Sequence, residues 1–321
     1  MQLDRVLAID LYKKMLLIRR FEEKVFVTFS TGAIPGTIHQ CMGEEATNVG
    51  IAVNMGDRDY MTFTHRCHGL CLARGVEPRK MLAEMFGKKT GVCKGMGGSI
   101  HYADAEHGLM GTNGIVGASV PQAVGAAWFC QYKETGGVAF SVFGDGCSNH
   151  GTVHESMNLA SIWKLPIIFI CVNNLYGFSM PFRLSTSVEN IADRASAYSM
   201  PGVIMDGMDV EDVYAKVKDA VEYVRHGNGP ILLESKTYRY RGHSRMEKGT
   251  VYRSQEEIDY WKSRDPIITY REKLVSEYGL SEAEFQMMED EISETLVDAL
   301  AFAESSPSPE PDEFLKYVYA T

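Results

Sequence analysis

The sequence lacks the features that would place the chain in a membrane, on nucleic acid or in an oxidising compartment. Its longest apolar runs, such as residues 165–172, are far shorter than the ~20 residues that a membrane span needs. The formal net charge of −10 disfavours nucleic acid and anionic membranes as partners. The seven cysteines form no CxxC pair and no metal-ligand cluster, which is typical of reduced thiols.

The N-terminal residues, MQLDRVLAID, also lack an apolar signal core and the composition of a transit peptide. We therefore expect a cytoplasmic protein without nucleic-acid or membrane partners. A chain of 321 residues with 45% hydrophobic residues is long enough to bury a full core.

Two short runs of β-branched and aromatic residues stand in the middle of the chain, at 138–143 and 167–172. Glycine or proline bounds each run, and a segment of helix length separates them, so they predict a strand-helix-strand unit of a parallel sheet. A strand-like segment at 202–206, an amphipathic helix at 209–225 and a strand at 231–238 continue the alternation. We therefore expect an α/β fold, with a doubly wound, mostly parallel sheet flanked by helices.

Polar residues follow both central strands: Gly144, Asp145 and Gly146 after the first, Asn173 and Asn174 after the second. Ligands bind beyond the carboxyl ends of parallel strands, and neighbouring strands lie roughly 5 Å apart. Either cluster alone is typical of an ordinary turn, but the pair favours one shared site. Mg²⁺ prefers oxygen ligands and often binds together with phosphates. Asp145, Asn174 and a backbone carbonyl near Tyr176 are therefore the predicted magnesium ligands.

This pattern resembles a known motif. A Gly-Asp-Gly sequence followed about thirty residues later by Asn-Asn is similar to the thiamine-diphosphate motif, in which the aspartate and the second asparagine bind Mg²⁺. The flanking sequences, GTVHESMNLASIWKLP and IIFICVNNLYG, resemble the alpha subunit of the first component of 2-oxo acid and acetoin dehydrogenase complexes. The resemblance extends over about residues 18–266. It implies the thiamine-diphosphate-binding fold with thiamine diphosphate and Mg²⁺ as cofactors.

The same resemblance assigns roles to further residues. It places His39 and His243, each on a loop, at the catalytic end of the site. It makes Arg66 a cofactor contact, and a guanidinium is well suited to phosphate because its donors form a rigid fork. The complete predicted set of cofactor-binding residues is His65, Arg66, Gly114, Val116, Asp145, Gly146, Cys147, Asn174 and Tyr176.

The resemblance also implies an assembly and a reaction. Single-chain thiamine enzymes carry two α/β domains, whereas this chain has room for the diphosphate-binding domain and its extensions. We therefore expect a beta subunit to complete the site in an α2β2 heterotetramer, and a lipoyl-bearing acyltransferase to receive the product. The expected reaction is cleavage of a carbon–carbon bond in pyruvate or acetoin, followed by transfer of the two-carbon acyl group to a lipoyl group.

Several alternatives remain at this stage. The segment HYADAEHGLMGTNGIVG favours the acetoin type slightly, and a branched-chain 2-oxo acid dehydrogenase alpha subunit is an alternative. A Mg²⁺-dependent protein that binds another phosphate ligand, or a non-catalytic relative, is a different class. Residues 244–247 depart from the usual Ser-x-Ser-Asp, which leaves substrate preference and phosphorylation control open. Val172 stands where relatives usually have a glutamate, a change that removes a buried carboxylate but keeps both predicted metal ligands.

The flanking regions give weaker signals. We divide the chain into an N-terminal helical extension with an active-site loop at 1–56, a thiamine-diphosphate-binding domain at 57–245 and a C-terminal helical extension at 246–321. The charged residues between 19 and 23 predict a solvated or interfacial helix face, and the basic segment 239–253 predicts an exposed loop. The glycine-rich segment 87–99 follows no strand and lacks the phosphate-loop spacing, so we expect an entrance loop there.

Overall fold

The computed structural model describes residues 3–245, 247 and 249–316. Its centre is a parallel six-stranded sheet in the order β2-β1-β3-β4-β8-β7. The predicted doubly wound, mostly parallel fold is confirmed. The strands of this sheet are β1 (Tyr60–Thr64), β2 (Leu109–Asn113), β3 (Ala139–Gly144), β4 (Ile167–Asn173), β7 (Gly202–Asp206) and β8 (Ile231–Lys236).

Helices cover both faces of the sheet, and this explains why its central strands read as continuous apolar runs. Alternate residues along β3 and β4 belong to two separate hydrophobic clusters, as a period of two requires. Helices α2 (Glu45–Ala52) and α8 (Val210–Arg225) pack with one cluster, and α5 (Ser119–Tyr132) and α6 (Gly151–Trp163) pack with the other. The N-cap of α8, Asp209, accepts hydrogen bonds from the first turn of that helix.

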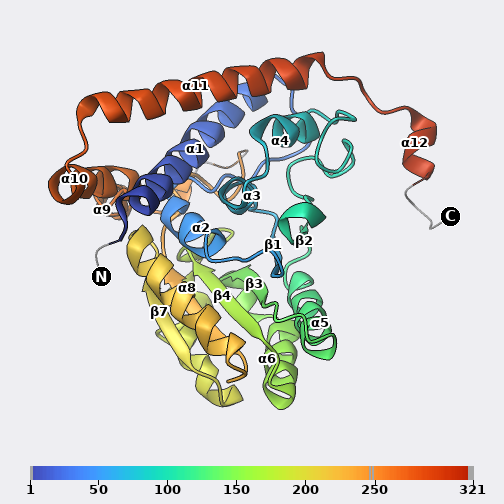
Figure 1. The fold of residues 1–321 in the computed structure, drawn as a ribbon, viewed down its shortest axis with the longest axis vertical. Coiled ribbons are helices and arrows are strands. Elements are labelled where there is room, and N and C mark those ends of the chain that lie inside the picture. The colour runs from blue at the N-terminus through green and yellow to red at the C-terminus, as the bar shows by residue number, and fades with distance from the viewer. Residues whose placement is uncertain (1–2, 246, 248, 317–321) are drawn as a thin grey trace.

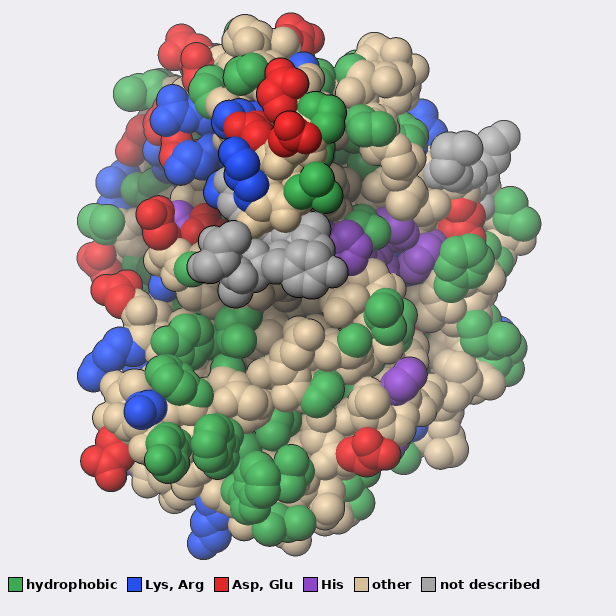
Figure 2. Space-filling model, turned by 90° about the vertical axis from the view of Figure 1, so that its right-hand side faces the viewer, with side chains coloured by type: hydrophobic (Ala, Val, Ile, Leu, Met, Phe, Trp, Pro, Cys, Tyr) green, Lys and Arg blue, Asp and Glu red, His purple; other side chains and the backbone are tan. Residues whose placement is uncertain are grey.

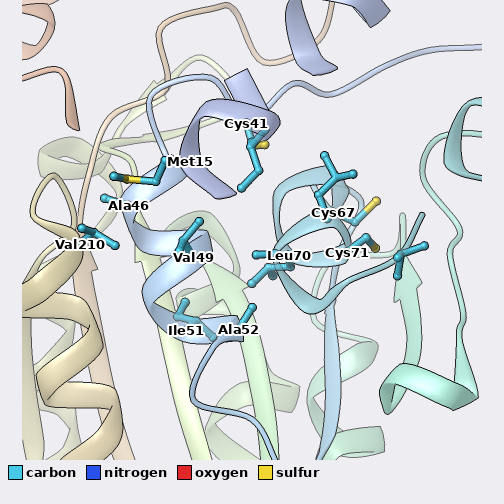
Figure 3. Close-up of a cluster of buried hydrophobic side chains, with 14 of the residues drawn as sticks. Met15, Cys41, Ala46, Val49, Ile51, Ala52, Cys67, Leu70, Cys71 and Val210 are labelled. Carbon is cyan, nitrogen blue, oxygen red and sulfur yellow. The ribbon is translucent and has the colours of Figure 1, made fainter. Parts of the chain in front are cut away.

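A helical layer extends the first cluster beyond the sheet. Figure 1 shows α1 (Arg5–Ser30) and α11 (Glu282–Ser305) crossing above the sheet. A capping box at Ser281 begins α11, and apolar residues at helical spacing form its buried stripe. In Figure 3, Met15 of α1, Val49 of α2 and Leu70 of α3 (His68–Arg74) lie in one buried cluster. The N-terminal helix therefore shares its core with the sheet.

The other helices are short or lie toward the C-terminus. None of the helices in the described ranges has the length and apolarity to cross a membrane. A two-stranded hairpin, β5 (Tyr176–Gly177) and β6 (Met180–Pro181), follows β4. The remaining α-helices are α4 (Pro78–Met85), α7 (Phe182–Ser185), α9 (Gln255–Lys262), α10 (Pro266–Tyr278) and α12 (Pro311–Leu315).

The charged face expected at residues 19–23 is only partly solvated, so that prediction is wrong for Arg19 and Glu22. The Glu22 side chain is fully buried, and its Oε1 lies 3.0 Å from His68 Nδ1. Arg19 is largely buried and pairs with Glu45 at 2.6 Å and with Asp265 at 2.9 Å. These partners lie far away in the sequence, so the local periodicity gave no sign of them.

The Glu22–His68 pair joins α1 to α3 as a buried ion pair. Burial by itself would lower the pKa of His68, but the neighbouring Glu22 carboxylate raises it to about 9. On the other side of the ring, Nε2 lies 3.1 Å from the carbonyl oxygen of Ser99. Both ring nitrogens therefore have partners within the protein, so His68 has a structural role.

The glycine-rich segment 87–99 closes around a carboxylate of the protein itself. Glu84, a fully buried residue of α4, accepts hydrogen bonds from the backbone N–H groups of Cys93, Gly95, Gly97 and Gly98. These are the groups that a phosphate-binding loop would offer to a ligand. In this structure they are bonded to Glu84.

We predict that His68→Leu lowers the free energy of unfolding by about 3–5 kcal/mol, because it leaves the Glu22 charge buried and unpaired. The double variant Glu22→Leu/His68→Leu should recover most of this loss, since an apolar pair of similar size carries no desolvation cost. Urea unfolding of both variants, with the exposed His226→Gln as control, measures the difference. Equal losses in the single and double variants would contradict the ion pair.

The same pair predicts a pH dependence of stability. The folded-state pKa of His68, about 9, lies above its ordinary value of 6.5. The stabilisation is therefore full below about pH 6.5 and is lost as the pH rises through about 9. Urea midpoints measured across this range should fall more steeply for the natural chain than for the double variant. Parallel pH profiles would contradict the prediction.

Candidate functional site

A cavity of about 400 Å³ opens beyond the carboxyl ends of β1, β3 and β4. The strand order reverses between β1 and β3, because the chain places β2 on one side of β1 and β3 on the other. Ligands of open α/β sheets bind at such a switch point. All eleven residues that the sequence predicted for the site line this cavity: His39, His65, Arg66, Gly114, Val116, Asp145, Gly146, Cys147, Asn174, Tyr176 and His243.

The pairing of β3 with β4 brings Asp145 and Asn174 to the same edge. Gly144 pairs with Val172, so the side chains that follow both strands point into the cavity. Both residues are buried, and neither Asp145 Oδ2 nor Asn174 Oδ1 has a hydrogen-bond partner among the described residues. Burial raises the pKa of Asp145 to about 6, although the nearby Arg239 opposes the shift. Buried oxygen atoms without partners are costly, so this pair is suited to a cation.

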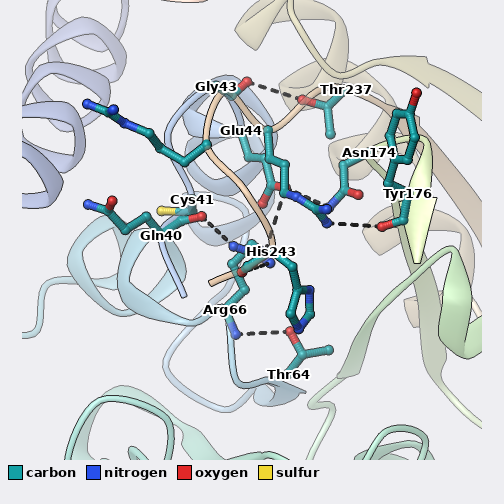
Figure 4. A network of polar contacts seen from close by, with 12 residues as sticks. Gln40, Cys41, Gly43, Glu44, Thr64, Arg66, Asn174, Tyr176, Thr237 and His243 are labelled. Atoms are coloured by element: carbon teal, nitrogen blue, oxygen red, sulfur yellow. Dashed lines mark hydrogen bonds and ion pairs between the residues drawn. The ribbon is translucent and has the colours of Figure 1, made fainter. Parts of the chain in front are cut away.

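Glu44 fixes the orientation of the asparagine. Asn174 Nδ2 donates to Glu44 Oε1 at 2.8 Å, and this bond leaves Oδ1 as the amide atom without a partner (Figure 4). Burial raises the pKa of Glu44, while Arg66, with its Nε 4.0 Å away, acts in the opposite direction. Sequence reasoning treated Glu44 as a helix start and missed this role. The one sequence feature that could have indicated this role is the position of Glu44 at the end of the loop that leads from His39 into α2.

Tyr176 lies in the tight β5–β6 hairpin, where Leu175 and Phe178 adopt positive φ angles of 72° and 60°. Such angles are unusual for residues with a Cβ and cluster at functional sites. Arg239 Nη1 donates to the Tyr176 carbonyl at 3.0 Å and thereby holds the hairpin (Figure 4). A carbonyl oxygen has a second lone pair, which stays available for a cation.

The basic segment 239–253 was expected to be exposed, and this prediction is wrong for Arg239 and Arg253. Arg239 is 1% exposed and lines the cavity, and Arg253 is 5% exposed. Arg253 donates to the Arg239 carbonyl at 2.6 Å and lies over the Tyr238 ring, 5.1 Å from its centroid. Aromatic and carbonyl partners thus bury both cations. Of residues 244–247, which differ from the usual Ser-x-Ser-Asp pattern, Met246 lies outside the described residues.

Three histidines gather at one end of the cavity. The ring centroids are separated by 4.4 Å for His39 and His65, 4.9 Å for His39 and His243, and 5.5 Å for His65 and His243. Burial lowers the pKa of His39 to about 2, of His65 to about 4 and of His243 to about 3, and the nearby Arg66 acts in the same direction on all three. All three imidazoles are therefore neutral near pH 7.

Arg66 connects the loops that carry these histidines. Its Nη2 donates to the carbonyl of His243 at 3.0 Å, and its Nη1 donates to the carbonyl of Gln40, the residue after His39 (Figure 4). The guanidinium has five N–H donors. The two hydrogen bonds leave donors for a ligand, although the side chain is also a structural connector.

The remaining predicted residues, Gly114, Val116, Gly146 and Cys147, also line the cavity. Val116 is 46% exposed and lies in the loop between β2 and α5, which also carries Gly114. Burial raises the pKa of Cys147 to about 12, so its thiol is neutral and unsuited to act as a nucleophile. A Cβ at Gly146 would lie 3.1 Å from Gly177 Cα, which shows how closely the loops after β3 and β4 approach.

Together these features define an α/β protein whose cavity is suited to a phosphate-bearing ligand and a divalent cation. The model of the dehydrogenase E1 component family matches residues 13–312. The chain therefore belongs to the dehydrogenase E1 component family. This is a family of thiamine-diphosphate-dependent enzyme components, as the sequence resemblance implied.

Curated relatives agree over nearly the full length. The alpha subunit of acetoin:2,6-dichlorophenolindophenol oxidoreductase from Bacillus subtilis is 43% identical, with 98% of this chain and 94% of that protein covered. The Cupriavidus necator protein of the same name is 39% identical, with 99% of this chain and 96% of that protein covered. The alpha subunit of the pyruvate dehydrogenase E1 component from Zymomonas mobilis is also 39% identical, with 97% of this chain and 88% of that protein covered.

We predict that Glu44→Leu weakens divalent-cation binding roughly 10–100-fold, as is usual when a group that orients a ligand is lost. Glu44→Gln should lose less, because its carbonyl oxygen still accepts from Asn174 Nδ2. Mn²⁺ paramagnetic resonance titrations with thiamine diphosphate present measure the affinity, and the exposed Glu222→Leu serves as control. Unchanged affinity in Glu44→Leu would contradict the assigned role.

Proposed function

We propose that this chain is the alpha subunit of a thiamine-diphosphate-dependent dehydrogenase that acts on acetoin or pyruvate. The enzyme cleaves a carbon–carbon bond and transfers the two-carbon acyl group to a lipoyl-bearing acyltransferase in the cytoplasm. The observation that carries the proposal is a pair of buried oxygen atoms, Asp145 Oδ2 and Asn174 Oδ1, at adjacent strand ends. Neither has a hydrogen-bond partner among the residues that the structure describes. The names of the acetoin and pyruvate relatives support both substrates.

In this proposal Mg²⁺ is held by Asp145, Asn174 and the carbonyl of Tyr176. Three oxygen donors of this kind, completed by diphosphate oxygens and water, suit the octahedral preference of Mg²⁺. Arg66 and Arg239 supply positive charge on the cavity wall. Arg239 Nε, a buried donor with no partner in the described part of the chain, is available for a phosphate oxygen. This local charge offsets the acidic character of the whole protein.

Thiamine diphosphate supplies the carbon nucleophile and the electron sink that cleavage requires. The residues of this chain bind the cofactor, orient the substrate and exclude water from the cavity. His39 and His243 are neutral imidazoles that can donate or accept a proton at an oxygen atom of the substrate. Leu70, Val142 and Phe143 are buried and give the cavity apolar walls that limit the entry of water.

An exposed apolar face next to the cavity is proposed to bind the beta subunit. Hydrophobic side chains gather over the lower part of the surface in Figure 2. Large apolar patches on a protein surface mark interaction sites. The relatives named here are each one subunit, alpha, of a larger enzyme, which agrees with a partner chain. The exposed residues of this face come from α5, α6 and the loop before α5: Ile115, Val116, Trp128, Phe129, Tyr132, Ile162 and Trp163.

We predict that Asp145→Asn lowers the affinity for thiamine diphosphate with Mg²⁺ by more than about 100-fold, since the charge of the metal ligand is lost. Calorimetric titration with and without Mg²⁺ measures it, and the exposed Asp298→Asn is the control. Binding of natural chain and variant with equal affinity would contradict the magnesium site. Turnover of the complex reconstituted with its beta subunit on acetoin, pyruvate and branched 2-oxo acids then decides the substrate.

We predict that Ile162→Arg prevents assembly with the beta subunit but leaves the chain folded, because Ile162 is 65% exposed on α6. The matched control is Ile268→Arg on α10, where the side chain is 58% exposed on another helix. Size-exclusion chromatography of the co-expressed chains measures assembly, and thermal unfolding tests the fold. Normal assembly of the Ile162 variant would show that this face is not the interface.

A further inference from the structure

We propose that His39, His65 and His243 form a second metal site, which takes a transition-metal ion such as Zn²⁺ or Co²⁺. This site is separate from the oxygen-donor site at Asp145 and Asn174. It differs in its donors, which are three imidazole nitrogens, and in the ions that it accepts. It also extends beyond the proposed reaction, in which two of these histidines contact the substrate.

The geometry of the three rings is already close to that of a metal site. Each histidine offers one ring nitrogen, and the three nitrogen atoms lie within 4.8 Å of one another. Zinc–nitrogen bonds of about 2.0–2.1 Å in a tetrahedral site place the ligand nitrogens roughly 3.4 Å apart. A metal ion would therefore require the half-buried rings to rotate toward one another. The fourth position faces the cavity and stays open for water or a ligand.

The hydrogen bonding of the rings leaves donors free for an ion. Nδ1 of His39 and Nδ1 of His243 are buried and have no hydrogen-bond partner in the described part of the chain. A buried ring nitrogen without a partner is unusual and calls for a ligand.

Arg66 organises the three ligands in advance. It follows His65 in the chain and bonds to the carbonyl of His243 and to the carbonyl of Gln40, the residue next to His39. One buried side chain thus connects the backbone segments of all three histidines. Ligands that are held in place before binding lose less conformational entropy when the ion arrives.

The surrounding charges make the site selective. The Arg66 and Arg239 guanidinium groups line the same cavity as the three histidines, so they repel any cation. Mg²⁺ and Ca²⁺ need oxygen ligands and cannot overcome this repulsion with three nitrogens. Zn²⁺, Co²⁺ and Ni²⁺ bind imidazole strongly enough to do so. A bound ion would occupy the substrate end of the cavity and inhibit turnover.

The experiment is a titration of the full chain with Co²⁺ in excess Mg²⁺, followed by visible absorption, with Zn²⁺ calorimetry in parallel. We expect one ion per chain, with absorption bands of a nitrogen-ligated Co²⁺ site. His65→Phe and His243→Gln should each reduce the affinity by at least roughly tenfold, since even changes around metal ligands cost 10–100-fold. Asp145→Asn and the exposed His226→Gln should bind Co²⁺ as the natural chain does.

Three results would overturn the proposal: no stoichiometric Co²⁺ binding, unchanged affinity in both histidine variants, or loss of binding in Asp145→Asn. Thermal unfolding shows whether each variant is folded. If His65→Phe or His243→Gln is not folded, His39→Gln is titrated in its place. The result does not depend on thiamine diphosphate, which is absent from the titration. A chain that binds Co²⁺ but not thiamine diphosphate would disprove the proposed function and leave this metal site standing.

Discussion

The parallel register of β3 and β4 is the constraint on which the rest of the site depends. Side chains alternate between the faces of a strand, so a shift of one residue would exchange the two faces of the sheet and bury the wrong set. With Gly144 opposite Val172, both apolar clusters are filled and both strands end together. The packing of the core and the position of the side chains of Asp145 and Asn174 are therefore fixed by the same pairing.

A second set of interactions joins the cavity to the helical layer. The Glu22–His68 pair connects α1 with α3, and Arg19 connects α1 with α2 and the start of α10. Buried charges of this kind contribute little net stability, but losing one partner is costly. They also fix the orientation of α2 relative to α1, and the start of α2 carries Glu44 to the cavity wall. The N-terminal helix thus acts on the site although none of its residues lines the cavity.

Much of the fold and of the cavity lining was predictable, because it is encoded locally. Strands such as β3 and β4 can be recognised as apolar runs with glycine or proline at their ends. The motif residues Asp145 and Asn174 directly follow these strands in the sequence. The unpredicted residues owe their roles to distant partners: Glu44 bonds to Asn174, 130 positions away, and Arg239 bonds to Tyr176, 63 positions away. Local charge patterns cannot tell a solvated arginine from one that is buried against carbonyl oxygens. The structure supplied those pairings.

The carboxylate of Glu84 has one further consequence. A glycine-rich loop with several converging N–H groups attracts any anion of suitable size, including a stray phosphate. Because the Glu84 side chain already accepts hydrogen bonds from these N–H groups, the loop cannot compete with the main cavity for a diphosphate. The Glu84 carboxylate thus keeps anions out of the glycine-rich loop and leaves the main cavity as the place where a diphosphate binds. A chain without this glutamate would have a second anion-binding site at the loop.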